Sequence, residues 1–318
     1  MKIIQEDELK GITSMETYSN GMMKSCILNE ENSISTEYGE LIPQYGEAIY
    51  GERQKKYRSS IAWYKNGQIK SIALDKQHEI KTPLGYYEAE LITFYENGNL
   101  KRIFPLNGKI DGFWSEEDEG NLCKSYNFKL KNGEIEAKII GIYLYDSGAL
   151  KSISLWPNEV VEVKIKDKLI EVRNGISFYE NGKIKSIEPQ NKLKIETPIG
   201  DIYAYDKDAI GIHGDQNSLV FSEEEEVIGI TTTHSAVKVS EKDSERTQWI
   251  EPLIVDSLIE DDEKTILPLK IKFEENEIIL TDDHPRSFDL ETNQFRVYIP
   301  MISETMSCSD CSSCTSCS

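Results

Sequence analysis

Four cysteines at the C-terminal end carry the clearest potential for chemistry. Cys308, Cys311, Cys314 and Cys317 stand at every third position of the segment 307–318, SCSDCSSCTSCS. Thiolates at this spacing can converge on one metal centre, and soft metals favour thiolate ligands. We therefore predict that these four residues are metal ligands, for an iron–sulfur cluster or for a soft ion such as Zn²⁺ or Cu(I).

The spacing leaves other uses of the tail open. Bacterial ferredoxins place three cluster ligands at this interval, but they place the fourth one residue further on and follow it with proline, unlike Cys317. Zinc sites usually use two cysteine pairs separated by a longer loop. Redox or disulfide exchange, the core of a ribosomally made modified peptide, and a tail without a ligand are the alternatives.

The histidines and the common catalytic motifs give no further site. His78, His213, His234 and His284 are not at metal-ligand spacing from one another or from a cysteine. The chain has no phosphate-binding loop, no GxGxxG and no GxSxG turn. The sequence therefore predicts that the protein is not an enzyme, with no catalytic residues and no residues for an organic cofactor.

One segment is similar to the start of a calcium loop. Asp206, Asp208 and Gly211 have the right types, but Ile210 occupies a ligand position and Asn217 stands where the loop needs glutamate. We predict no calcium site there.

An internal repeat sets the elements that position these residues. Its five copies are YSNGMMKSC from Tyr18, YKNGQIKSI from Tyr64, YENGNLKRI from Tyr95, YDSGALKSI from Tyr145 and YENGKIKSI from Tyr179. Asn-Gly between β-forming flanks supplies the two positive-φ residues of a type I′ turn, so each copy predicts a β-hairpin, although Ser147-Gly148 in the fourth copy suits this turn less well. The predicted fold class is mainly β: an elongated antiparallel sheet built from repeated β-hairpins, with a smaller acidic β accessory region and a flexible tail.

A two-residue turn fixes the cross-strand partners. The expected pairs are Tyr64–Ile69, Trp63–Lys70, Ile61–Ile72, Tyr95–Leu100, Phe94–Lys101 and Ile92–Ile103. One face then carries tyrosines beside aliphatic residues, and the other carries aromatic rings beside lysine stems. Folding alone explains the motif on this interpretation; a ligand-binding ladder of tyrosines or lysines is the alternative.

Three further residues or segments complete the structural expectations. Cys26 takes the place that Ile72 and Ile187 hold in other copies, which predicts a small buried hydrophobic residue. Cys123 follows an acidic loop and is not assigned. Long periodic helical stretches are absent, and only short pieces, such as the segment 249–260, are candidates for a helix.

The phrases FYENGKIKSI at 178–187, FYENGNLKRI at 94–103 and PLNGKIDGFW at 105–114 resemble MORN-type repeats of bacterial proteins, in particular the variant of the YwqK-like antitoxin family. The resemblance covers roughly residues 14–205. It implies a sheet of successive hairpins that serves in interaction with proteins or membranes and not in catalysis.

Charge suggests how the chain is divided. Residues 1–213 hold 33 acidic and 28 basic side chains, a net charge of −5, whereas residues 214–318 hold 23 and 8, a net charge of −15. We predict a MORN-like hairpin repeat domain at 1–213, an acidic accessory β-region at 214–303 and a flexible cysteine-rich tail at 304–318.

The net charge of −20 argues against nucleic acid as a partner. No apolar run approaches the length of a membrane helix, and the N-terminus MKIIQEDELK turns acidic, so we predict a cytoplasmic protein without an integral membrane segment. The predicted function is a non-enzymatic interaction scaffold for a protein partner, with a metal-binding tail. The alternative is an antitoxin- or immunity-like binding module whose tail is incidental. The partner and the oligomeric state stay open.

Overall fold

The structure is a computed structural model. It describes residues 8–46, 53, 59–110, 114–209, 214–244, 246–256 and 264–300. Within these residues the chain is mainly β, which confirms the predicted fold class, and α1 (Glu116–Leu122) is the one α-helix.

The chain divides into two compact units. Unit 1 takes its described residues from Met1–Val161, Ser177–Lys183 and Gly211–Asp215, and unit 2 from Glu162–Ile176, Ile184–Ile210 and Gln216–Ser318. The division of the chain at 213/214 and at 303/304 stays a prediction.

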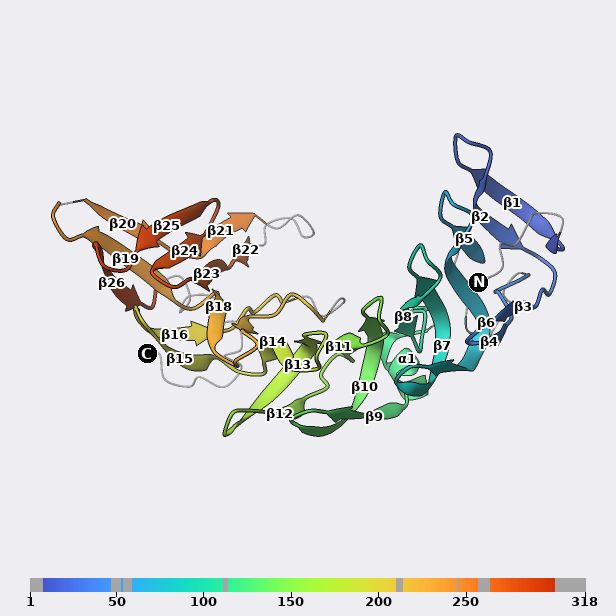
Figure 1. Cartoon of the computed structure of the whole chain (residues 1–318), viewed down its shortest axis with the longest axis horizontal. Helices are drawn as coiled ribbons and strands as arrows, with labels where there is room; N and C mark the ends of the chain where they lie inside the picture. The colour runs from blue at the N-terminus through green and yellow to red at the C-terminus, as the bar shows by residue number, and fades with distance from the viewer. Residues whose placement is uncertain are drawn as a thin grey trace, which may run out of the picture. The chain divides into compact units, whose positions relative to one another are not determined.

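Unit 1 contains an antiparallel sheet of successive hairpins (Figure 1). In pairing order its strands are β1 (Ile12–Thr17), β2 (Met23–Leu28), β5 (Ile61–Trp63), β6 (Ile69–Thr82), β7 (Gly85–Phe94), β8 (Leu100–Phe104), β10 (Gly133–Leu144) and β11 (Leu150–Leu155). Two smaller pairings join β3 (Ile34–Thr36) to β4 (Gly39–Leu41) and β9 (Ser125–Leu130) to β10. β12 (Val161–Ile165) and β13 (Lys168–Phe178) hold residues of both units.

Unit 2 is also antiparallel. Its largest sheet runs through β14 (Ile184–Pro189), β17 (Leu219–Phe221), β18 (Val227–Thr232), β23 (Leu269–Phe273), β24 (Glu277–Thr281) and β25 (Pro285–Asp289). The smaller pairings use β15 (Leu193–Thr197), β16 (Gly200–Ala204), β19 (Ala236–Glu241), β20 (Thr247–Ile250), β21 (Leu253–Asp256), β22 (Lys264–Leu267) and β26 (Asn293–Tyr298). Within the largest sheet, β23 and β24 pair as a hairpin.

The repeat turns have three-residue loops, so the predicted type I′ turn is wrong. In the second copy the Gly67 N–H donates to the Tyr64 carbonyl (3.0 Å), and the Tyr64 N–H donates to the Gln68 carbonyl (2.8 Å). Gly67 has a φ of 82°, whereas the φ of Asn66 is not positive. This is a type I turn followed by one left-handed residue, and the other four copies have the same two backbone hydrogen bonds.

A β-bulge follows the turns of the first four copies and places a lysine outside the pairing. Phe94 pairs with Leu100, but Thr93 pairs with Arg102, so Lys101 is the extra residue. Lys24, Lys70 and Lys151 occupy the same position in the copies that begin at Tyr18, Tyr64 and Tyr145. The predicted pairs Tyr64–Ile69, Trp63–Lys70, Tyr95–Leu100 and Phe94–Lys101 are therefore wrong.

The register away from the turn was predicted correctly. Ile61 pairs with Ile72 and Ile92 with Ile103, because the bulge restores the register that the longer loop shifts by one residue. These isoleucines belong to a row that continues across the strands through Ile142 and Ile153, and every member is at most 1% exposed. This row is the centre of the core in unit 1.

A hairpin of the same form occurs in unit 2, at the acidic segment 222–226. The Glu225 N–H donates to the Ser222 carbonyl, and the Ser222 N–H donates to the Glu226 carbonyl. Glu225 stands where the repeat has its glycine, and its φ is 62°. Phe221 pairs with Val227 and Val220 with Gly229, which leaves Ile228 as the bulge residue. The acidic run is thus a hairpin turn that the sequence pattern did not reveal.

The helix of the described residues lies elsewhere than predicted. Over 249–256 the chain forms parts of β20 and β21, so the predicted helix is wrong there; residues 257–260 lie outside the described residues. α1 instead begins after Ser115, whose side chain accepts the Asp118 N–H, while the Asp118 side chain accepts the Ser115 N–H. This capping box was the overlooked sequence signal.

Candidate functional site

Tyrosine hydroxyls link each repeat of unit 1 to the next. The hydroxyls donate to backbone carbonyls in the pairs Tyr18–Trp63 (2.8 Å), Tyr64–Phe94 (2.8 Å), Tyr95–Leu144 (2.7 Å) and Tyr145–Phe178 (2.8 Å). Each acceptor directly precedes the tyrosine of the following copy. The repeated tyrosine therefore stabilises the stack of hairpins, and one such bond contributes about 0.5–1.5 kcal/mol.

The bulge lysines lie over these tyrosine rings. The distances from Nζ to ring centroid are 5.8 Å for Lys70 and Tyr64, 5.2 Å for Lys101 and Tyr95, and 5.5 Å for Lys151 and Tyr145. The predicted lysine–aromatic contact therefore exists, but its aromatic partner is the tyrosine and not the buried Trp or Phe. Such contacts contribute about 0.5–1 kcal/mol at exposed sites.

Tyr143, which is not one of the repeat tyrosines, has two cationic side chains over its ring. The Arg102 guanidinium lies 4.4 Å and the Lys151 Nζ 4.3 Å from the ring centroid of Tyr143. Burial raises the pKa of the Tyr143 hydroxyl, but the charge of Lys151, a hydrogen bond with Tyr95 and the charge of Lys101 outweigh it, so the pKa is lowered. We call the residues Tyr64, Lys70, Tyr95, Lys101, Arg102, Tyr143, Tyr145 and Lys151 the Tyr–Lys face.

Small residues continue this face toward the N-terminal strands. Ser25, Ala62, Ser71 and Thr93 are directly paired from strand to strand, and Thr93 is paired to Arg102. The first four line a hollow of about 550 Å³. Unit 1 therefore has one sheet face built of isoleucines and an opposite face with a hollow, hydroxyls and cations.

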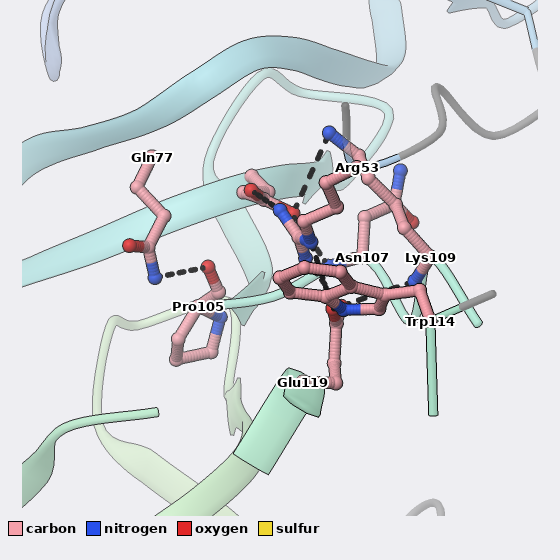
Figure 2. A network of polar contacts seen from close by, with 8 residues as sticks. Arg53, Gln77, Pro105, Asn107, Lys109, Trp114 and Glu119 are labelled. Atoms are coloured by element: carbon pink, nitrogen blue, oxygen red, sulfur yellow. Dashed lines mark hydrogen bonds and ion pairs between the residues drawn. The ribbon is translucent and has the colours of Figure 1, made fainter. Parts of the chain in front are cut away.

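A buried charge cluster in unit 1 joins β7, the loop after β8 and α1 (Figure 2). We use this name for Arg53, Glu90, Lys109, Trp114 and Glu119. The Arg53 guanidinium bonds to both carboxylates: Nη1 and Nη2 donate to Glu90, and Nε (2.7 Å) and Nη2 donate to Glu119. Glu90 and Glu119 are only 2% and 0% exposed.

Backbone and indole donors complete the cluster. Glu90 Oε2 accepts the Asn107 N–H (2.9 Å), and Glu119 accepts the Lys109 N–H (3.0 Å) and the Trp114 indole N–H (2.8 Å). The ammonium of Lys109, itself buried, lies 3.8 Å from Glu90. All four carboxylate oxygens are therefore engaged, which suits a structural clamp between β7, the 105–110 loop and α1.

The pKa shifts of Glu119 and Arg53 favour the charged forms of these two side chains, whereas that of Lys109 does not. Burial raises the pKa of Glu119, but the hydrogen bonds from Arg53, Lys109 and Trp114 outweigh it and the pKa is lowered. Burial likewise opposes the charge of Arg53, and its bonds to Glu119 and Glu90 keep the pKa raised. Burial lowers the pKa of Lys109.

Unit 2 holds a buried glutamate in a different setting. Glu188 is 0% exposed and accepts the N–H groups of Asp206 (3.3 Å) and Ser218 (2.8 Å), while Arg173 lies 3.7 Å away. Arg173 directs Nη2 to the Asp206 carbonyl (2.6 Å) and stacks on Tyr205. Burial dominates here, and the pKa of Glu188 is raised.

The predicted metal ligands Cys308, Cys311, Cys314 and Cys317 lie outside the described residues. Their role stays a prediction.

The other candidates are placed by the structure as follows. His78 is exposed, His234 packs edge-on against Tyr203, and His284 is exposed beside Asp283; His213 lies outside the described residues. In the segment that is similar to a calcium loop, Asp206 Oδ1 accepts the Asp208 N–H, as in an ordinary turn, while Ile210 and Gly211 lie outside the described residues. Asp282, Asp283 and His284 lie close together, but Arg286 already pairs with Asp282.

Both cysteines of the described residues are buried. Cys26 is 1% exposed in the core row, as predicted, and burial raises the pKa of its thiol to about 11. Cys123 is 4% exposed at the end of α1, and burial raises its pKa as well. Burial therefore disfavours the reactive thiolate form at both residues.

Comparison with known proteins supports the repeat assignment. Residues 87–110 and 175–192 match the family model described as a MORN repeat variant, so the chain carries MORN-type repeats. The first match runs from β7 into the loop of the buried charge cluster, and the second contains the turn after Tyr179. Neither the curated proteins nor the solved structures contain a significant match. In the described residues, no helix has both the length and the apolar character needed to cross a membrane.

Proposed function

We propose that this protein is a non-enzymatic repeat scaffold that binds a partner protein on the Tyr–Lys face of unit 1. MORN-type repeats are generally non-enzymatic and suggest binding, which supports the general class. The observation that carries the proposal is the contrast between the two sheet faces. One is closed by the isoleucine row, whereas the other presents cations and tyrosine rings next to the 550 Å³ hollow.

The buried charge cluster supports this role indirectly. It ties the loop after β8 to β7 and α1 through charges that are fully bonded, so Lys101 and Arg102 lie on a strand whose end is fixed. A rigid strand presents its side chains at lower entropic cost on binding.

Charge reversal on the face tests the proposal. The full chain, its Lys101→Glu/Arg102→Glu variant and the matched control Lys192→Glu would be used to capture partners from the native host, with bound proteins identified by mass spectrometry. Lys192 is exposed in the turn before β15. We expect the same partner with the full chain and the control, and its loss with the double variant. Capture of that partner by the double variant would contradict the proposal.

Metal binding by the tail is a second proposed activity, and only the spacing of its cysteines supports it. We propose that Cys308, Cys311, Cys314 and Cys317 bind a soft metal or an iron–sulfur cluster that organises the tail on binding. Metal analysis and absorption spectra after anaerobic reconstitution would compare the full chain with a chain that lacks 304–318. Equal metal content in the two would contradict this proposal. Unchanged, metal-independent partner capture by the shortened chain would instead favour the antitoxin-like alternative, in which the tail is incidental.

A further inference from the structure

The bulge lysines of unit 1 form a regular row. Lys24 lies on β2, Lys70 on β6, Lys101 on β8 and Lys151 on β11. In the pairing order β2–β5–β6–β7–β8–β10–β11, each lysine stands two strands from the next. Adjacent strands lie about 4.8 Å apart, so the row repeats about every 10 Å.

Most of this row has no acidic partner of its own. Among the described residues, Lys70, Lys101 and Lys151 have no carboxylate within 4.0 Å, although the chain carries a net charge of −20. Lys24 differs, because Glu16 pairs with it at 2.9 Å. The free cations therefore extend from β6 to β11, and Glu16 marks the end of the row where an anionic ligand would be repelled.

The carboxylate of Asp146, at the tip of the fourth hairpin, is occupied by other groups than the lysines. Asp146 accepts the side-chain amides of Asn97 (2.8 Å) and Asn99 (3.2 Å). These contacts join one turn to the next without involving the lysines. The row is therefore available to an external anion.

The interval of about 10 Å selects a ligand conformation. A polyproline II segment rises about 3.1 Å per residue with three residues per turn, so every third side chain lies on one side at intervals of about 9.3 Å. In a β-strand the residues i and i+3 point to opposite faces, which excludes that conformation. An α-helix would need acidic residues about seven positions apart, where its rise gives about 10.5 Å.

The chemistry of the face favours polyproline II over a helix. Polyproline II segments dock on aromatic surfaces, and each free lysine here lies on a tyrosine ring. Their backbone has no internal hydrogen bonds. The hydroxyl of Ser71 on β6, which lines the hollow, offers a partner to such a backbone, whereas a helix satisfies its backbone internally.

We propose that the lysine row binds an acidic segment of a partner protein in the polyproline II conformation, with a carboxylate at every third residue, lying across the strands from β6 to β11. This inference rests on the proposed function, because it names the chemistry of the partner that the Tyr–Lys face would take.

Labelled synthetic peptides test the inference by fluorescence polarisation with the full chain. One peptide repeats Glu-Pro-Pro, a second has the same composition with its glutamates in one block, and a third is a helix-forming peptide with glutamate at every seventh position. We expect the Glu-Pro-Pro repeat to bind at least tenfold more tightly than either of the others, and binding to weaken as salt rises.

Two variants place the binding on the row. Lys101→Glu and Lys151→Glu are each expected to weaken binding of the Glu-Pro-Pro peptide at least tenfold, while Lys192→Glu leaves it unchanged. Near-ultraviolet circular dichroism confirms that each variant is folded. Lys101→Gln is expected to lie between wild type and Lys101→Glu, since it removes a charge without reversing it.

The outcomes separate this inference from the proposed function. Equal affinity for the block or the helical peptide, or binding only to anionic phosphatidylserine vesicles, would overturn the inference. If the partner is nevertheless lost from the Lys101→Glu/Arg102→Glu variant, the proposed function stands while its polyproline II ligand is rejected. Retention of the partner by that variant rejects the proposed function.

Discussion

The hairpins of unit 1 and the hairpin at 222–226 in unit 2 share a backbone but differ in their side chains. Both have a type I turn, one left-handed residue and a bulge. In unit 2, however, Ser222 replaces the tyrosine, Glu225 the glycine and Ile228 the bulge lysine. The hairpin therefore forms without the Tyr, Gly and Lys that mark the repeat. Hairpin formation does not require the lysine, which leaves its regular row on unit 1 open to a binding role.

The two units also treat a buried carboxylate differently. Glu119 is bonded by a guanidinium, an indole and a backbone N–H, and its pKa is lowered. Glu188 is bonded mainly by backbone N–H groups with Arg173 further away, and its pKa is raised. At Glu119 the hydrogen bonds, led by that from Arg53, outweigh burial, whereas at Glu188 burial outweighs the hydrogen bonds and the more distant Arg173.

Removing Arg53 is expected to have the largest effect. Arg53→Met leaves both Glu90 and Glu119 buried without their main counter-charge, and we expect a loss of about 3–5 kcal/mol in the free energy of unfolding. Urea unfolding followed by tryptophan fluorescence measures it, since Trp63, Trp114 and Trp156 report on unit 1.

The matched variant in unit 2 is Arg173→Met. Its expected cost is smaller, because Glu188 keeps its backbone donors and can accept a proton. Equal costs for the two arginine variants would contradict the distinction between the two sites.

The pH dependence of the two glutamates should have opposite signs. Glu119, with its lowered pKa, stabilises the fold above the usual 4.5 of a glutamate, and this stability is lost as the pH falls through the folded pKa. Glu188, with its raised pKa, contributes stability below 4.5 that is lost as the pH rises through the folded pKa.

Glutamine variants measure these contributions. From about pH 3 to about pH 7, the stability difference between wild type and Glu119→Gln should grow, whereas the difference between wild type and Glu188→Gln should shrink. Urea titrations at several pH values provide the measurement. Parallel pH profiles for the two variants would refute the assignment.

The tyrosine link is expected to have an intermediate effect. Tyr95→Phe removes the hydroxyl that donates to the Leu144 carbonyl, and we expect a loss of about 0.5–1.5 kcal/mol in unit 1. Tyr86→Phe is the control, since Tyr86 is 63% exposed. A thermal melt in which the two variants coincide would argue against the role of the tyrosine ladder.

The smallest effect concerns the left-handed residue of the unit 2 hairpin. Glu225→Gly should stabilise the protein by about 0.5–1 kcal/mol, because glycine adopts a positive φ without a steric penalty. The gain is reduced by the loss of the exposed hydrogen bond from the Lys166 N–H to Glu225. Glu223→Gly, at an exposed position without positive φ, should give no such gain in urea unfolding.

The sequence could predict what depends on short-range pattern. The Ile61–Ile72 and Ile92–Ile103 pairs follow from counting across the turn, because the loop and the bulge shift the register in opposite directions. The pairs next to the turn were wrong for the same reason. Asn-Gly suits both a type I′ turn and a type I turn with a left-handed glycine, and the sequence does not distinguish the two.

The site depends on contacts that no local pattern contains. Arg53 meets Glu90 and Glu119 across separations of 37 and 66 residues. The sequence shows that a lysine recurs at the same position of each repeat. That these lysines share one face follows from the bulge, which places each of them outside the strand pairing. The hairpin at 222–226 was missed because four successive glutamates hide the turn, and its left-handed residue is not a glycine.

The capture experiment with charge-reversed unit 1 tests the central claim most directly, namely that the Tyr–Lys face binds the partner. The account predicts that the Lys101→Glu/Arg102→Glu chain stays folded and loses a partner that the full chain and Lys192→Glu both capture. Undiminished capture of that partner by the folded double variant would contradict the account.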